Sequence, residues 1–549
     1  MRLLPWAPLL ALILLCSLEI NAYLVPRQQA PCENTPTTRN CWGQYNLNTD
    51  YYNVVPDKGV FREYWLSIEN ATLAPDGYER QVLVVNGTLP GPVIEGNWGD
   101  NFVIHVTNNL QNNGTAIHWH GIRMLNTNQY DGVPGLVDGV YGPLVIHGPV
   151  SADYDVDVGS IFLSEWSHVT SSVEWETAWK FGGRLIVATP VSASGLINGM
   201  NIYPCTGSDP ACRGTGRRFE LRFQRGKRYL LRLVNPQADG WLKFSIDNHD
   251  FLVVANDLVP IVPYRTNNVI ITSGQRYDIV VEANQDIGNY WMRATPQVSP
   301  CQSPENENPN NIRGIIRYDG ASATADPISA AWPLSQSCGD EPYNELVPYL
   351  AKNVEDGISE TWLRIGWYFQ LNVIFHWTVG TRDLVIDWEN PTNLLIAEGE
   401  SVFPSEYIIY EVPSRNQWTY WIVQDTSIIN AWHSFHLHGH DFYLLAQGQG
   451  LYNRFTVRLN LRNPPRRDTA TMPGGGYIVI AFPSDDPGSW LFHCHIAWHA
   501  SQGLSLQFVE RESEIPGVID DGYDEFDRIC RSWNSYVDTA RYEQVDSGI

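Results

Sequence analysis

The segment GDNFVIHVTNN, residues 99–109, alternates apolar and polar side chains between two turn-forming ends. Successive side chains of a β-strand point to opposite faces. We therefore expect Phe102, Ile104 and Val106 to face a core, and the residues between them to face outward. This period of two, bounded by Gly and Asn, is typical of a half-buried strand.

The same pattern returns twice along the chain, in GKRYLLRLVNP (226–236) and, more loosely, in RNQWTYWIVQD (415–425). Three copies of one strand indicate three similar β-sandwich domains, and 549 residues are too many for a single core. Helix signals are sparse, and we expect short helices only at residues 172–180 and 523–532. The sequence therefore predicts an all-β, multidomain fold.

Residues 1–22 have the form of a secretory signal peptide, with a short apolar run that ends on a small residue, Ala22. Three glycosylation sequons, at Asn70, Asn86 and Asn113, fit an exported glycoprotein. No later stretch is apolar enough to anchor the chain in a membrane. The net charge of −24 argues against a nucleic-acid partner, whose phosphates would be repelled. We expect a secreted, extracellular protein.

Cysteine usage fits an oxidising compartment. Of nine cysteines, Cys16 leaves with the signal peptide, and most of the others should pair. Near neighbours pair most simply as Cys32 with Cys41, Cys205 with Cys212, and Cys301 with Cys338. Cys494 lies between two histidines in HCHIAWH, where a thiolate is more useful as a metal ligand than as a crosslink. Cys530 is then left without a partner.

Half of the fourteen histidines lie in two short stretches, AWHSFHLHGHDF (431–442) and LFHCHIAWHASQGLSL (491–506). Another HxH pair stands in AIHWHG, at His118 and His120. On a strand, residues i and i+2 face the same way, so an HxH pair presents two imidazoles to one place, and neutral imidazole suits copper. We expect five isolated histidines to be ordinary polar residues: His105, His147, His168, His249 and His376.

One thiolate with two imidazoles makes the trigonal site of an electron-transfer copper, whose potential depends on its axial neighbour. Cys494, His433 and His499 supply this set. Leu504, five residues beyond His499, cannot coordinate, so the site should be a stronger oxidant than one with an axial Met. The histidines on either side of Cys494 point away from it, so that one tripeptide connects this copper to a second metal centre.

With these motifs the chain resembles the multicopper oxidases, and within them the secreted laccases of ascomycete type. The matching motifs are HWHG (118–121), HSFHLHGH (433–440) and HCHIAWH (493–499), with support from SGQRYDIVVEAN (273–284) and the terminal DSGI (546–549). The resemblance implies three cupredoxin-like Greek-key β-sandwich domains. We place them at residues 30–150, 151–335, without copper, and 336–549, with the type 1 copper.

The resemblance also implies up to four copper ions and their ligands. Type 1 takes His433, Cys494 and His499 beside Leu504; type 2 takes His118 and His436; the two type 3 ions take His120 with His495 and His438 with His493. Asp131 resembles the family's acid beside the cluster, although an ordinary turn aspartate before Gly132 would give the same sequence pattern. Asp239 resembles the carboxylate that accepts the phenol proton, with a plain turn residue as the alternative. The carboxylate of Ile549 resembles a tail that plugs the solvent channel.

One departure from the family pattern is serious. After HWHG the family has a second HxH pair, reached through a stretch that holds a cysteine, whereas this chain passes directly from Gly135 to Leu136. On the order of 40 residues, about three strands, would be missing from the first domain. Each type 3 copper would lose one ligand. The missing cysteine is the family's partner for Cys530, which agrees with the cysteine count.

A mispredicted intron boundary, a splice variant or a genuine loss would each produce this gap, and we favour the first because the pattern holds elsewhere. The sequence predicts a monomeric laccase that oxidises phenols and aromatic amines and reduces dioxygen to water. A ferroxidase is less favoured without a membrane anchor, and an ascorbate-type oxidase is disfavoured by Leu504. The alternative function is a copper-binding protein with a type 1 centre, a defective trinuclear site and little or no oxidase activity.

Overall fold

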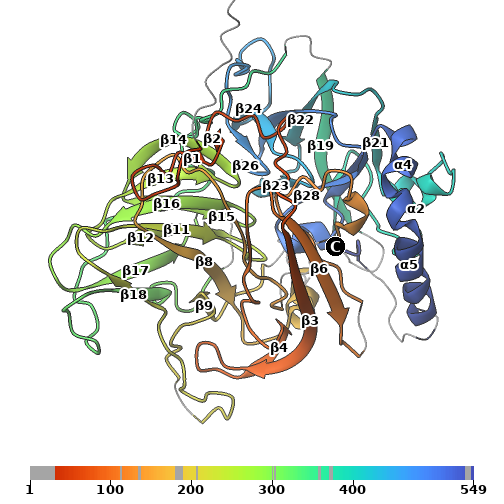
Figure 1. Ribbon diagram of the computed structural model, residues 1–549. Helices are drawn as coiled ribbons and strands as arrows, with labels where there is room; N and C mark the ends of the chain where they lie inside the picture. Colours follow the sequence, from red (N-terminus) through yellow and green to blue (C-terminus); the bar gives the residue numbers. More distant parts are fainter. Residues whose placement is uncertain are drawn as a thin grey trace, which may run out of the picture.

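The computed structural model describes residues 31–111, 114–133, 138–179, 189–205, 208–299, 301, 305–355, 360–369, 375–537, 539 and 546–549. The predicted signal peptide (1–22), the Asn113 sequon and the junction of Gly135 with Leu136 lie outside these residues. Within them the chain is mostly β-structure in three groups of sheets (Figure 1). No described helix has the length and apolar character needed to cross a bilayer.

The first group of sheets is the smallest and appears in orange in Figure 1. A three-stranded sheet has the order β4-β3-β6, from β3 (Phe61–Leu73), β4 (Arg80–Val85) and β6 (Asn101–Asn108). A second sheet pairs β5 (Ile94–Asn97) with β7 (Leu144–His147). The short strands β1 (Cys41–Trp42) and β2 (Tyr45–Asn46) precede them.

The second group is a sandwich of a six-stranded and a five-stranded sheet, with the orders β14-β13-β16-β11-β8-β9 and β10-β18-β17-β12-β15. Its strands are β8 (Val156–Trp166), β9 (Ser194–Ile197), β10 (Glu220–Phe223), β11 (Arg228–Val234), β12 (Trp241–Ile246), β13 (Phe251–Asn256), β14 (Val259–Thr266), β15 (Asn268–Thr272), β16 (Arg276–Glu282), β17 (Asn289–Pro296) and β18 (Arg313–Tyr318). One apolar core, including Phe244, Phe251 and Ile279, fills the space between the two sheets.

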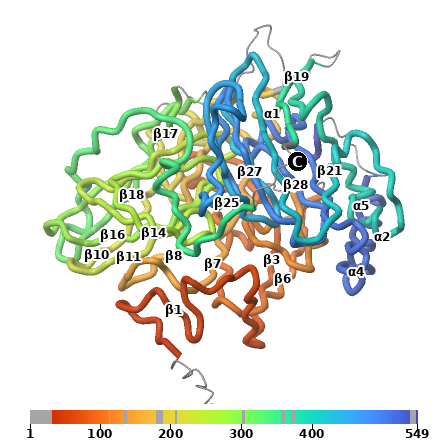
Figure 2. The backbone as a smooth tube through the Cα atoms, turned by 90° about the horizontal axis from the view of Figure 1, so that it is seen from above, coloured from red at the N-terminus to blue at the C-terminus, as the bar shows by residue number. Residues whose placement is uncertain are grey.

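The third group repeats this plan, with the orders β20-β19-β22-β27-β24-β25 and β21-β29-β28-β23-β26. Its strands are β19 (Glu360–Phe369), β20 (Phe375–Val379), β21 (Ile409–Val412), β22 (Trp418–Asp425), β23 (His433–Leu437), β24 (Phe442–Gln449), β25 (Arg466–Arg467), β26 (Thr469–Met472), β27 (Gly476–Pro483), β28 (Gly488–Cys494) and β29 (Ser505–Glu510). Figure 2, seen from above, places β28 near the middle of the molecule, close to the orange strands β3 and β6.

The three sequence repeats become the same strand of each group. They form β6, β11 and β22, and each of these runs parallel to the first long strand of its group, β3, β8 or β19. The repeat interpretation is confirmed. One detail is wrong: Val106 is 41% exposed, although the alternation predicts that it faces the core. Phe102 and Ile104 do pack on the first core, but among the described strands nothing covers the far end of β6.

Helices are few. They are α1 (Ser171–Trp179), α2 (Thr392–Ala397), α3 (Ala497–Ser501), α4 (Ile515–Ile519) and α5 (Tyr523–Val537). The two helices expected at 172–180 and 523–532 correspond to α1 and α5, the latter five residues longer than predicted. The disulfides Cys32–Cys41, Cys205–Cys212 and Cys301–Cys338 are formed as expected, and the described Cys494 and Cys530 are both free and buried.

The last described residues return to the third group of sheets. The amide of Ser547 donates to the carbonyl of Ser501 at 2.8 Å, and the Ser547 hydroxyl donates to the carbonyl of Ala500 at 2.7 Å. Ile549 packs against the core of this group. In Figures 1 and 2 the C-terminus accordingly lies within the outline of the molecule. The tail is therefore docked beside α3, and its role as a plug stays a prediction.

Candidate metal centres

One thiol and two imidazoles meet inside the third group of sheets. Cys494 ends β28, His433 begins the neighbouring strand β23, and His499 lies on α3. The Cys494 Sγ is 3.7 Å from His433 Nδ1 and 3.5 Å from His499 Nδ1, and these two nitrogens are 3.1 Å apart. All three side chains are buried. The three donor atoms thus form a small triangle.

This triangle fits a metal ion better than it fits hydrogen bonds. Burial lowers the pKa of His433 to about 3, and burial first, with the neighbouring His433, lowers that of His499, so both rings are neutral. Burial also raises the pKa of the Cys494 thiol, and a bound cation is what would displace its proton. Two nitrogens that each lie about 2.0 Å from the same metal ion are separated by about the 3.1 Å observed between His433 Nδ1 and His499 Nδ1. A trigonal copper suits this donor set.

Leu504 is fully buried beside this triangle. Its carbonyl accepts the amide of Cys494 at 3.0 Å, and its own amide donates to the carbonyl of His499 at 3.0 Å. Its backbone therefore fixes two of the three ligand residues relative to each other. Its side chain offers no donor atom to a metal.

Six further histidines gather where the first group of sheets meets the third. His436 lies on β23 and His493 on β28, while His438 and His495 follow these strands directly. His118 Nε2 is 3.0 Å from His436 Nε2, and His438 Nε2 is 3.2 Å from His493 Nε2. The rings of His120 and His495 have centroids 5.0 Å apart. The residues that the resemblance pairs on each copper are therefore neighbours in space.

Hydrogen bonds to the other ring nitrogens hold several of these imidazoles in place. Asp131 does this for two of them: one carboxylate oxygen is 2.8 Å from His118 Nδ1 and the other is 2.9 Å from His438 Nδ1. His436 Nδ1 is 2.8 Å from the carbonyl of Asp468, and His493 Nδ1 is 2.9 Å from that of Cys494. Such partners leave Nε2 directed at the metal.

Asp131 is therefore more than a turn residue. Burial alone would raise the pKa of its carboxyl, but the charges and hydrogen bonds of His118 and His438 hold that pKa below its usual range. An ionised carboxylate accepts hydrogen bonds and has no proton of its own to give. The contacts place Asp131 where it can orient two rings at once, and its role as the acid beside the cluster stays a prediction.

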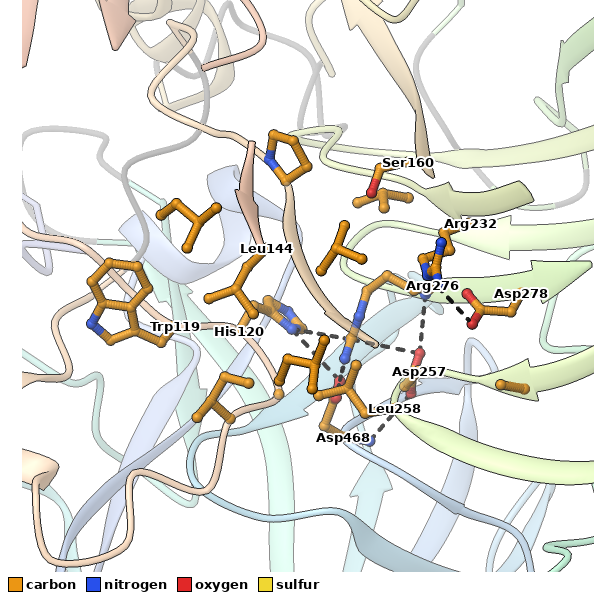
Figure 3. Close-up of a pocket in the computed structure, with 18 of the residues that line it drawn as sticks. Trp119, His120, Leu144, Ser160, Arg232, Asp257, Leu258, Arg276, Asp278 and Asp468 are labelled. Atoms are coloured by element: carbon orange, nitrogen blue, oxygen red, sulfur yellow. Dashed lines mark hydrogen bonds and ion pairs between the residues drawn. The ribbon is translucent and has the colours of Figure 1, made fainter. Parts of the chain in front are cut away.

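His118 and His120 do not lie on a strand, contrary to the expectation from their alternation. They belong to an irregular segment with a turn at His120, and Gly121 directly after it has a positive φ. His120 is instead held from the second group of sheets: the Arg276 Nη1 donates to His120 Nδ1 at 3.0 Å and also binds Asp468 at 2.6 Å (Figure 3).

Three buried nitrogens here have no hydrogen-bond partner among the described residues: His120 Nε2, His495 Nδ1 and His495 Nε2. A buried polar atom without a partner costs about 1–3 kcal/mol. Burial first, together with the neighbouring cationic and imidazole groups, lowers the pKa of both rings, so neither gains a proton to compensate. A neutral imidazole has one lone pair for a metal, so coordination would satisfy one nitrogen of the His495 ring.

Sequence reasoning assigned no role to Gly121, Gly274, Arg276 or Asp468. A Cβ on Gly274 would lie 2.6 Å from the His495 ring, and one on Gly121 would lie 2.3 Å from Arg276. Both glycines have positive φ angles, so only Gly fits without strain. The one available signal was the charged Arg276 at the start of the strand segment RYDIVVE (276–282).

Asp239 lies on the loop between β11 and β12, next to the first triangle of donors. The carbonyl of its neighbour Ala238 accepts the amide of Ala497, the first residue of α3, at 2.7 Å. Asp239 is only 5% exposed, and burial raises the pKa of its carboxyl to about 8.

The isolated histidines are ordinary polar residues, as expected. His105 lies 2.9 Å from Glu63, His168 lies 3.0 Å from Asp76, and His249 lies 2.7 Å from the Tyr318 hydroxyl. The other two also face carboxylates: His147 faces Glu95 and Asp157, and His376 faces Asp383.

Comparison with known proteins agrees with this geometry. The chain is 44% identical to "Laccase-2" of Botryotinia fuckeliana, with 96% of each chain covered. It is similar to the crystal structure of the laccase from Botrytis aclada, at 44% identity and a TM-score of 0.89, covering 94% of this chain and 100% of that one. Fet3p, a multicopper oxidase of iron import, shares the fold at 21% identity and a TM-score of 0.74, with 86% and 95% covered.

The alignment with "Laccase-2" runs over 571 positions, more than the 549 residues of this chain. It therefore leaves gaps in this chain. Family profiles described as multicopper oxidase match residues 67–143, 157–321 and 378–514, one in each group of sheets. With this coverage and identity, the chain belongs to the multicopper oxidase family.

Proposed function

We propose that this multicopper oxidase is a laccase, which oxidises phenols and aromatic amines and reduces dioxygen to water. The observation that carries the proposal is the pair of donor sets joined by one tripeptide. Cys494 belongs to the first set, and His493 and His495 on either side of it belong to the second. Bound copper would supply one-electron acceptance at the first set and four-electron reduction of dioxygen at the second.

The ligand assignments follow the neighbours found above. Type 1 copper is assigned to His433, Cys494 and His499 beside Leu504, as the trigonal triangle suggests. The second set is assigned to type 2 and type 3 copper in the pairs of histidines already described. Burial lowers the pKa of His120, His436, His438, His493 and His495 and so holds these rings neutral. Asp131, Asp468 and Arg276 fix the orientation of rings in this set. Cu(II) binds such preorganised imidazoles without first displacing protons.

Phenol oxidation also releases a proton, for which we propose Asp239 as the acceptor. Burial raises the pKa of Asp239 to about 8, so its carboxylate form, which can take a proton, becomes populated only as the pH rises toward that value. We expect kcat/KM for a phenol to increase with pH up to about 8.

In Asp239→Asn this increase should disappear, and kcat/KM for phenols should fall about 100-fold, the lower end of what a positioned base contributes. Oxidation of hexacyanoferrate(II), which gives an electron without a proton, should be unchanged. The check is the pH profile of oxygen uptake with each donor. Equal losses with both donors would contradict the role of Asp239.

The gap after Gly135 stays a prediction, and several features support it. The first group of sheets has three-stranded and two-stranded sheets, where the other groups have six and five. A cavity of about 560 Å³ lies between the first and second groups, beside His120 and Trp119 and the apolar Leu144 (Figure 3). Missing strands would leave such a cavity.

Cys530 supports the gap independently. It lies on α5, and the same helix reaches the first group of sheets, because a Cβ on Gly114 would lie 2.5 Å from the Trp533 ring. A partner cysteine in a longer first group of sheets would therefore lie close to Cys530.

The test of the proposed function measures copper per chain, the thiolate-to-copper absorption band and oxygen uptake with a phenol. We expect the band together with phenol-dependent oxygen uptake, four phenols oxidised for each dioxygen. The band without any oxygen uptake would favour the copper-binding alternative, which the similarity to laccases along the whole chain disfavours. Amplifying the transcript across Gly135 and Leu136 decides the origin of the gap. Assaying a chain with the relative's segment restored shows whether the gap reduces the activity.

We also propose that the protein is secreted and acts as a monomer. The three disulfides fit an oxidising compartment. Asn70 and Asn86, which begin two sequons, are both exposed. Mass measurement of the protein from culture medium, before and after glycosidase treatment, checks the first point, and sedimentation checks the second.

A further inference from the structure

A second carboxylate lies directly behind the loop that carries Asp239. Glu165 is near the end of β8, and its side chain accepts the amide of Ala238 at 2.5 Å. The amide of Asp239 donates to the same carboxylate. Two successive backbone donors thus bind one side chain, an arrangement that fixes the direction of the peptide between them.

The opposite side of this loop faces the copper ligands. The Ala238 carbonyl accepts the amide of Ala497 on α3, the helix that carries His499. Further along the loop, the amide of Ser273 donates to the carbonyl of Gly240 at 3.2 Å. The residue that carries the proposed proton acceptor is therefore clamped between Glu165 and the type 1 site.

The side chain of Asp239 contributes nothing to this fixation. Within the described part of the chain it makes no hydrogen bond or ion pair, and burial alone raises its pKa. Its position consequently depends on its backbone, and the side chain that holds that backbone is Glu165. Glu165 in turn has no ion-pair partner among the described residues, so these two amide donors are its principal described contacts.

We propose that Glu165 is a positioning residue, which holds Asp239 where a phenol bound at the type 1 site can give up its proton. This inference rests on the proposed function, and specifically on Asp239 as the acceptor. A shift of about 1 Å in a reacting group reduces a rate substantially, because the barrier depends steeply on alignment. Glu165 would thus affect the rate of phenol oxidation without contacting the phenol.

A neighbouring acid offers a matched control. Glu174 on α1 is also buried, and its carboxylate accepts the hydroxyl of Ser167 instead of the loop amides. Both Glu165→Gln and Glu174→Gln replace a buried carboxyl by an amide in the same region, and burial raises the pKa of both carboxyls. Only the first weakens the support of Ala238 and Asp239.

The experiment follows the bleaching of the type 1 absorption band under anaerobic conditions, with a phenol or with hexacyanoferrate(II) as the electron donor. In Glu165→Gln we expect the rate with the phenol to fall about tenfold. The rate with hexacyanoferrate(II) and the intensity of the band should stay as in the unaltered protein. In Glu174→Gln both rates should stay unchanged.

An unchanged phenol rate in Glu165→Gln would overturn the proposal, and so would an equal loss with both donors, which indicates a general structural role. A loss in Glu174→Gln as large as that in Glu165→Gln would overturn it as well, because replacing either buried carboxyl of the region would then have the same effect. Type 1 reduction needs no dioxygen. A failure of dioxygen reduction would therefore count against the proposed laccase function and leave this test intact.

Discussion

Replacing Cys494 by Ser should abolish the thiolate-to-copper absorption band and reduce phenol oxidation to background. A serine hydroxyl stays protonated where burial already disfavours the thiolate, so no anionic ligand remains for the first copper. The substitution also removes the sulfur donor through which the tripeptide joins the first donor set to His493 and His495. Visible absorption, copper content and oxygen uptake with a phenol measure the effect.

Cys530 provides the matched control, since it is the other free, buried cysteine of the described chain. Cys530→Ser should keep both the band and the activity. A Cys494→Ser protein that still shows the band, or a Cys530→Ser protein that loses it, would refute the assignment of the type 1 ligands.

Replacing Asp131 by Asn should reduce oxygen uptake or copper retention at the histidine cluster by about 10–100-fold, the usual loss when a partner of a metal ligand is removed. The Asp131 carboxylate accepts one hydrogen bond from His118 and one from His438, which belong to different coppers. An amide offers only one acceptor atom, so one of the two rings loses its orientation.

The thiolate-to-copper absorption band of the first donor set should keep its intensity in Asp131→Asn. An unchanged band shows that the protein is folded. Asp138→Asn is a suitable control, because that carboxylate belongs to the same group of sheets but binds Arg80 and Ser171. Loss of the band in Asp131→Asn, or equal effects of both substitutions, would show that Asp131 stabilises the fold and does not orient ligands.

Much of the fold could be predicted because its signals are local. The strand at residues 99–109 can be predicted from its own alternation, and the repetition of this pattern predicts three sandwiches. Cys205 and Cys212 are seven residues apart, so proximity in sequence already means proximity in space. The Cys494 tripeptide likewise carries three donors in one short motif.

The remaining parts of the site depend on contacts between distant segments. Arg276 and Asp468 lie 192 positions apart, and their joint support of His120 becomes visible only when the second and third groups of sheets meet. In the sequence Asp131 looks like a turn residue. Its contacts with His118 and His438 become visible only in the folded chain. Val106 was misassigned because alternation predicts which face a side chain takes but says nothing of whether a neighbour covers that face.

The contact of His118 with His436 joins residues 318 positions apart in the chain. A copper ion held by both would close a loop of that length without a covalent bond. By thermodynamic linkage, metal that binds only the assembled site stabilises that assembly in proportion to its affinity. The supply of metal during folding would then decide how firmly the amino-terminal and carboxy-terminal parts of the protein bind each other, so that folding and metal loading become one event.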